Sequence, residues 1–207
     1  MRLPADAVLL VVDVQEAIDD PRWGPRNNPG AEDNIARLIA RWRTEGLPLI
    51  HIRHDSVEPG SPYAPGAPGH RFKSCAAPQK GERVVGKSAN SGFIRPDLEA
   101  ALDDIGATTL VICGVLTSNS VEATARHAGG LGYQTFVVGD ASWAVDKVDL
   151  NGRRWPADDV HALSLAHLHR EYATVVDTET TLQAAATAKA RQRRGVGVRD
   201  DVSNRAR

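Results

Sequence analysis

The sequence has few cysteines and no long apolar run. Only Cys75 and Cys113 occur among its 207 residues, so neither a disulfide framework nor a zinc site built on thiolates is expected. No stretch approaches the roughly 18 to 20 consecutive apolar residues that a membrane span needs. The charged Asp6 comes just before the first apolar run, which leaves no room for a signal peptide. We therefore expect a cytoplasmic protein without a membrane partner.

The sequence also lacks an excess of charge. Its formal net charge is -1 at pH 7, which gives no reason to expect a nucleic-acid partner. The charge is unevenly distributed, because residues 184–207 carry seven Lys or Arg against two Asp. The length and the 42% hydrophobic content suit one domain with a full core. We predict this domain over residues 1–183, followed over residues 184–207 by the end of the C-terminal helix and a flexible basic tail.

Apolar runs alternate with segments of helical periodicity along the chain. We predict strands over residues 7–12, 49–53, 83–86, 108–113, 134–138 and 173–176, and helices over residues 34–42, 97–102, 121–128, 157–169 and 180–190. This alternation predicts an α/β fold, a three-layer α/β/α sandwich whose six-stranded, mostly parallel sheet is doubly wound and Rossmann-like. Residues 58–81 form a long segment rich in Pro and Gly, which is typical of a functional or mobile loop.

Chemically active side chains stand at three predicted strand ends. Asp13 follows the first strand, Lys87 follows the third, and Ser120 lies in the turn after the fourth. The carboxyl ends of parallel strands lie at one edge of a sheet, so we expect these three side chains to meet. An ammonium beside a buried carboxylate keeps that carboxylate charged and ready to act as a general acid or base.

Three motifs at these positions resemble the isochorismatase-like hydrolases. They are Val11–Gln15, Gly86–Phe93 and Gly114–Arg126, and the resemblance covers about residues 5–182. It implies a homodimer or homotetramer that acts on a small polar substrate, as the cysteine amidohydrolases of the family cleave amides. It also implies an oxyanion site formed by the amides of Leu116 and Ser120, with a cis peptide between Val115 and Leu116.

Ser120 is where this chain departs from the amidohydrolase pattern, which has a nucleophilic cysteine there. The serine is an engineered replacement, a natural nucleophile, or part of a site that never forms a covalent intermediate. The resemblance thus implies an Asp13–Lys87–Ser120 version of the triad for carbon–nitrogen bond hydrolysis. Two alternatives stay open: vinyl-ether hydrolysis driven by Asp13, as in isochorismatases, and a non-catalytic binding protein. The former is disfavoured because isochorismatases carry an extra segment before the aspartate strand.

Further residues are candidates for contact with the substrate. Trp23 lies on the loop after Asp13, Phe93 closes the second motif, and Arg53 and His54 end the second strand. The metal-binding nicotinamidases of the family carry an Asp-x-His pattern after that strand, which residues 51–55 do not match. We therefore expect no metal and no cofactor.

Overall fold

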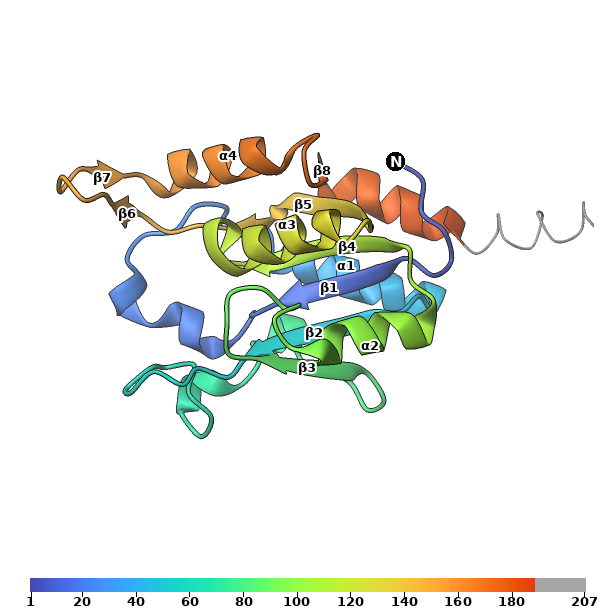
Figure 1. Cartoon of the computed structure of the whole chain (residues 1–207), viewed down its shortest axis with the longest axis horizontal. Helices are drawn as coiled ribbons and strands as arrows, with labels where there is room; N and C mark the ends of the chain where they lie inside the picture. Colours follow the sequence, from blue (N-terminus) through green and yellow to red (C-terminus); the bar gives the residue numbers. More distant parts are fainter. Residues whose placement is uncertain (189–207) are drawn as a thin grey trace, which may run out of the picture.

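A six-stranded parallel sheet lies at the centre of the computed structural model, which describes residues 1–188 (Figure 1). The strand order is β3-β2-β1-β4-β5-β8, and every neighbouring pair is parallel. The strands are β1 (Val8–Val12), β2 (Leu49–His54), β3 (Arg83–Lys87), β4 (Thr109–Val115), β5 (Gln134–Trp143) and β8 (Thr174–Val176). The predicted six-stranded α/β sandwich is confirmed.

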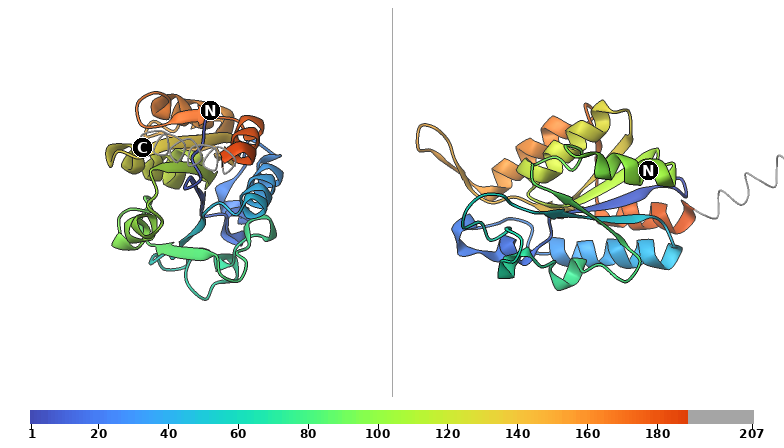
Figure 2. Two further views of the ribbon diagram at one scale, coloured as in Figure 1. Left: turned by 90° about the vertical axis from the view of Figure 1, so that its right-hand side faces the viewer. Right: turned by 60° about the horizontal axis from the view of Figure 1, so that its bottom comes forward.

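Helices cover both faces of the sheet, as the two views of Figure 2 show. Helix α1 (Ala31–Glu45) and the C-terminal helix over residues 178–188 pack on one face. Helices α2 (Pro96–Ile105), α3 (Glu122–Gly130) and α4 (Ala157–Leu168) lie on the other. No helix among the described residues is long and apolar enough to cross a membrane.

Strand β1 supplies side chains to both hydrophobic cores. Leu9 and Val11 belong to the core beneath α1, whereas Val8, Leu10 and Val12 belong to the core beneath α2 and α3. Successive side chains of a strand point to opposite faces, so a strand covered on both faces must be apolar throughout. This explains the uninterrupted apolar run at the start of the sequence.

Several elements differ from the sequence-based expectation. Strand β5 continues to Trp143 instead of ending at residue 138, and an antiparallel hairpin of β6 (Lys147–Val148) and β7 (Arg154–Trp155) follows it. Strands of two residues are too short to show an alternating pattern, so periodicity could not predict them. A π-helical turn, η5 (Thr117–Val121), precedes α3.

The C-terminal helix begins two residues before its predicted start and is followed to residue 188. Ala185 and Ala188 are buried against the α1 side of the core, so the helix packs on the domain beyond residue 183. The predicted basic tail from Lys189 onward lies outside the described residues.

Candidate active site

The ammonium of Lys87 contacts the side chains of the other two predicted strand-end residues, Asp13 and Ser120. Its Nζ lies 2.5 Å from Asp13 Oδ2 and 3.1 Å from Ser120 Oγ. All three residues are buried, and the Lys87 side chain is only 1% exposed. An ion pair this deeply buried needs good geometry to offset the loss of hydration, and the ammonium provides it by donating to both oxygens.

Backbone geometry at the ends of β1 and β4 positions two of these side chains. Asp13 adopts a left-handed conformation with φ 54°, which aspartate tolerates better than most residues, and its N–H donates to the Ile52 carbonyl. Gly114 has φ 123°, and a Cβ there would collide with the backbone of Val12. Only glycine lets β4 approach β1 so closely just before the turn that carries Ser120.

The two oxygens of the Asp13 carboxyl group have different surroundings. Oδ2 accepts from Lys87, whereas Oδ1 is buried without a hydrogen-bond partner among the described residues. Burial raises the pKa of the Asp13 carboxyl above its ordinary value, against the opposing effect of the Lys87 ammonium. A carboxylate with a raised pKa is a stronger base, and its unpaired oxygen can accept a proton or hydrogen bond from a reacting group.

Lys87 and His54 form a second contact at the site. Lys87 Nζ donates to the Ala89 carbonyl at 3.1 Å and lies 3.3 Å from His54 Nδ1. Burial and the nearby ammonium lower the pKa of His54, which favours the neutral ring at pH 7. Gln15 fixes the backbone here, because its amide group accepts from the His54 N–H and donates to the carbonyls of His54 and His70.

A cavity of about 200 Å³ opens above Asp13 and Ser120. Trp23 and His54, two of the four residues predicted to contact substrate, line this cavity. The Trp23 indole N–H donates to the Ala17 carbonyl at 2.8 Å, and its ring meets Tyr63 edge to face with centroids 6.2 Å apart. The volume is below the roughly 300 to 1,000 Å³ typical of ligand pockets, which favours a small substrate.

The structure places the other two predicted substrate contacts away from this cavity. Phe93 packs in the core beneath α2 and α3, with its ring 5.3 Å from that of His127 and 5.9 Å from that of Tyr133. Arg53 pairs with Asp55, its Nε 2.8 Å from Oδ1. Arg53 and His54 are consecutive residues of β2, so their side chains point to opposite faces and only one can face the cavity.

Several cavity residues were not predicted from the sequence. They are polar or aromatic residues of the loop after β2 and two asparagines beside the predicted motifs: Ser56, Glu58, Ser61, Tyr63, Asn90 and Asn119. The asparagines lie within the motifs that contain Lys87 and Ser120, which is a signal that could have identified them. The loop residues have no such signal, because their position depends on how residues 55–81 fold back over the sheet.

The turn before Ser120 has the backbone form expected from the resemblance. The peptide between Val115 and Leu116 is cis, and the Leu116 carbonyl accepts from the amides of Asn119 and Val121. Leu116 and Ser120 both line the cavity. The assignment of their amides to an oxyanion site stays a prediction.

Neither cysteine lies at the cavity with an activated thiol. Cys75 lies outside the cavity, and burial raises the pKa of its thiol to about 11. Cys113 is fully buried in β4, and its thiol pKa is also raised by burial. Within residues 1–188 no group of three or more His, Cys, Asp or Glu side chains is arranged to hold a metal ion.

The chain is similar to proteins of one family over most of its length. Residues 7–180 match the isochorismatase domain. The chain is 40% identical to the isochorismatase family protein YrdC of Bacillus subtilis over 171 residues, which is 83% of this chain and 91% of that protein. A solved structure of an isochorismatase family protein from Chromobacterium violaceum shares 51% identity with a TM-score of 0.87, covering 90% of this chain and 97% of that one.

Two more distant relatives have names that state an activity. One is streptothricin hydrolase of Streptomyces noursei, 38% identical over 138 residues, which is 67% of this chain and 50% of that protein. The other is ureidoacrylate amidohydrolase RutB of Methylobacterium radiotolerans, 29% identical over 175 residues, with 67% of each chain covered.

Proposed function

The chain belongs to the isochorismatase family of hydrolases, and we propose that it cleaves a carbon–nitrogen bond of the amide type in a small polar substrate. One observation carries the proposal. Below a cavity of about 200 Å³, a single ammonium contacts both a buried carboxylate and a hydroxyl, those of Asp13 and Ser120. The names of the two more distant relatives, one of them an amidohydrolase, support the same type of reaction.

In the proposed reaction Ser120 Oγ attacks the substrate carbonyl carbon while Asp13 accepts the hydroxyl proton. The unpaired Oδ1 and the raised pKa of Asp13 suit it to this task better than an ordinary aspartate. Asp13 then gives the proton to the leaving nitrogen as the carbon–nitrogen bond breaks, which leaves an acyl ester on Ser120. Water, deprotonated by Asp13, hydrolyses the ester and regenerates the hydroxyl.

Lys87 has an electrostatic role in this scheme. Its ammonium favours the ionised form of Asp13, because it opposes the desolvation that raises the carboxyl pKa. Its contact with Ser120 Oγ holds the hydroxyl oxygen and stabilises negative charge that develops on it. The amides of Leu116 and Ser120 are the proposed donors to the carbonyl oxygen.

A second candidate reaction uses Asp13 without a covalent intermediate. The raised pKa of Asp13 favours its protonated form, and a protonated carboxyl could deliver a proton to an enol-ether carbon. This route does not need the Ser120 hydroxyl. It therefore predicts that Ser120→Ala retains activity, whereas the amidase route predicts that Ser120→Ala loses it.

The experiment is a turnover screen of small amides and enol ethers with the wild-type chain, Ser120→Ala and Asp13→Asn. Amide turnover that both substitutions abolish, together with an acyl adduct on Ser120 in mass spectra of quenched reactions, supports the proposal. Enol-ether turnover that survives Ser120→Ala supports the second route instead. Saturable binding of one of these compounds without any turnover would favour a binding protein and contradict both schemes.

A further inference from the structure

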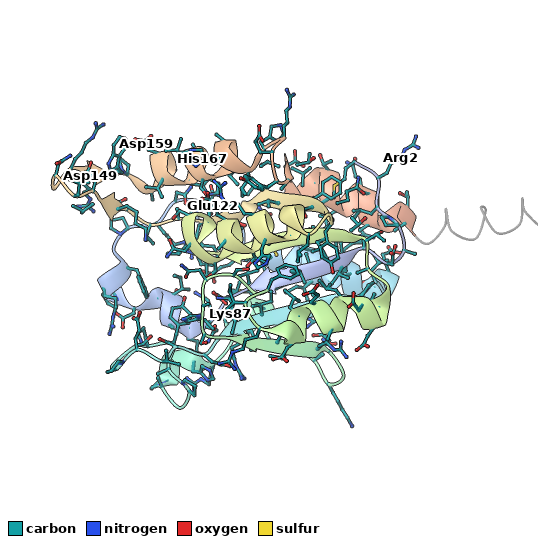
Figure 3. The ribbon with its side chains drawn as sticks, in the orientation of Figure 1. Arg2, Lys87, Glu122, Asp149, Asp159 and His167 are labelled. Atoms are coloured by element: carbon teal, nitrogen blue, oxygen red, sulfur yellow. The ribbon has the colours of Figure 1, made fainter. Side chains whose placement is uncertain are left out.

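The cavity above Asp13 and Ser120 has an acidic lining. Among the described residues that form its walls, two carry a carboxylate, Asp13 and Glu58, and none is a lysine or an arginine. The charge of Asp13 is offset by the ammonium of Lys87, which lies at the carboxyl end of the sheet in Figure 3 and is only 1% exposed. His54 favours its neutral form because its pKa is lowered. The formal charge that remains for a ligand in the cavity is therefore the negative charge of Glu58.

The carboxylate of Glu58 has no hydrogen-bond or ion-pair partner within residues 1–188. The hydrogen bonds of this residue are made by its backbone: the N–H donates to Ser56 Oγ at 3.2 Å, and the carbonyl accepts from the Ser61 N–H at 3.2 Å. Arg22, which contacts the same loop, pairs with Asp20, its Nε 3.0 Å from Oδ1. Glu58 is exposed, so its carboxylate is free to bind a cation that enters the cavity.

The loop that carries Glu58 is held in place at its base and at its tip. At the base, the Ser56 N–H donates to the Tyr63 carbonyl at 3.1 Å. At the tip, Arg22 Nη1 donates to the Gly60 carbonyl at 3.4 Å, which joins the loop to the segment that follows β1. Because the loop is closed on itself and attached to a neighbouring segment, the backbone of Glu58 has a defined position at the cavity.

Aromatic rings also line this cavity. Trp23 and Tyr63 both contribute to its walls, and their rings meet edge to face with centroids 6.2 Å apart. Aromatic faces attract a cation that lies within about 6 Å of the ring centroid. The charge of Glu58 acts inside the cavity as well, because it is one of the carboxylates that oppose the lowering of the His54 pKa. A carboxylate and two aromatic rings in one small cavity are a combination that suits an ammonium group.

The same lining is unsuited to an anionic substrate. Proteins bind carboxylate and phosphate groups chiefly through the guanidinium of arginine or the ammonium of lysine. Neither group lines this cavity among the described residues, and the buried ammonium of Lys87 already contacts Asp13 and Ser120. A substrate carboxylate would instead lie near the like charge of Glu58, which repels it.

We propose that the substrate of this chain is an amide that carries a cationic group, and that Glu58 binds this cation at the wall of the cavity. The inference rests on the amide hydrolysis proposed above and names the charge class of its substrate. In this role Glu58 is a specificity residue, because it contacts the cation and takes no part in the proton transfers of Asp13. A contact that is equal in the ground state and the transition state lowers KM without changing kcat. The preference for a cation should therefore appear in KM.

The test uses three primary amides of the same chain length that end in different groups. They are γ-aminobutyramide with an ammonium, valeramide with a methyl and glutaramate with a carboxylate, and hydrolysis of each releases ammonia. The full wild-type chain should have its highest kcat/KM with γ-aminobutyramide, about 5-fold or more above valeramide, and its lowest with glutaramate. The assays are run at low ionic strength, because salt screens an exposed carboxylate.

Two substitutions of Glu58 test its part in this order of substrates. Glu58→Gln removes the charge and should reduce the ratio of kcat/KM for γ-aminobutyramide over valeramide by about 5-fold, through KM. Glu58→Lys should reverse the order of γ-aminobutyramide and glutaramate. Glu16→Gln is the matched control: Glu16 pairs with Arg71 and does not line the cavity, so this variant should keep the wild-type ratio. Circular dichroism of every variant verifies that it is folded.

Binding to Ser120→Ala separates the cation site from the reaction. Titration of this variant with the three amides, followed by ligand-observed NMR, measures affinity without acyl transfer. Affinity that falls in the order γ-aminobutyramide, valeramide, glutaramate, with no ammonia released by the wild type, would contradict the proposed reaction and support the cation site. Ammonia release at equal kcat/KM from the three amides would support the reaction and overturn the cation site. The inference is likewise overturned if Glu58→Gln keeps the wild-type ratio, or if the chain neither cleaves nor binds any of the three amides.

Discussion

Acid–base clusters lie at the two ends of strand β3, and they differ in whether both oxygens of the carboxylate are hydrogen-bonded. Glu82, just before the strand, has both oxygens bonded: Arg43 donates to Oε1 and Oε2 at 2.7 and 2.9 Å, and His51 Nε2 lies 2.9 Å from Oε2. Lys87, the last residue of the strand, pairs with Asp13, whose Oδ1 has no partner in the described part of the chain. Both carboxylate oxygens of Glu82 are therefore bonded, and the unpaired atom of its cluster is His51 Nδ1, whereas in the Asp13 cluster a carboxylate oxygen is free to accept from a reacting molecule.

The pKa values of the two carboxyl groups follow this difference. Hydrogen bonds from Arg43 lower the pKa of Glu82 to about 2, whereas burial raises the pKa of Asp13 above its ordinary value. A carboxyl group with a lowered pKa stabilises the folded state at neutral pH, whereas one with a raised pKa destabilises it. Carboxyl groups of the second kind are typical of functional sites. We therefore interpret Glu82 as structural and Asp13 as catalytic.

The largest effect is expected from Asp13→Asn. The amide keeps the shape of the side chain but cannot accept a proton, so kcat/KM should fall by about 1,000-fold or more on any confirmed substrate. Steady-state kinetics measure the loss, and circular dichroism verifies the fold. A variant with more than a tenth of the wild-type kcat/KM would show that Asp13 is not the base.

A smaller effect is expected from Ser120→Cys. The ammonium of Lys87, 3.1 Å from Ser120 Oγ, should lower the pKa of a thiol at this position below its usual value of about 8.5. Alkylation by iodoacetamide at pH 7 should then be about 10-fold faster than that of free cysteine. The wild-type chain is the control, because Cys75 and Cys113 both have raised thiol pKa values. A rate at or below that of free cysteine would mean that the cluster does not activate a nucleophile.

Glu82→Gln should reduce stability and leave activity unchanged. Because its folded-state pKa of about 2 is below the ordinary 4.5, Glu82 stabilises the fold above pH 4.5 and loses this contribution as the pH falls through about 2. We expect a loss of about 1 to 2 kcal/mol in the free energy of unfolding at pH 7, and a smaller difference from wild type at pH 3. Urea unfolding at the two pH values measures both. A variant that is inactive at full stability would contradict the structural role.

The smallest effect concerns the pH dependence of kcat/KM, whose acid limb should be shifted to higher pH than an ordinary aspartate would give. Proton transfer to Asp13 requires its ionised form, and its pKa is raised, so the acid limb of kcat/KM should lie above pH 3.8. Glu82→Gln should leave this limb in place, since Glu82 titrates lower and lies at the other end of β3. An acid limb at or below pH 3.8 in the wild type would contradict the raised pKa.

Only one of the two clusters could be predicted from the sequence. Asp13, Lys87 and Ser120 were expected to meet because each follows a strand of one parallel sheet, and the structure brings them together. The Glu82 cluster was not predicted. Arg43 and His51 reach Glu82 from different elements, and no local pattern marks such a contact.

The sequence by itself determined how the six sheet strands alternate with helices along the chain, and the edge of the sheet where the reactive residues lie. Hydrophobic periodicity and strand direction depend on residues close together in the chain, so they can be inferred from the sequence. The tertiary structure alone decided which side chains enter the cavity. In the folded protein His54 and Tyr63 line the cavity, Arg53 pairs with Asp55 outside it, and Phe93 lies in the core. The physical reason is that the direction of a side chain at a strand end, and the path of a loop, depend on packing between segments far apart in the chain.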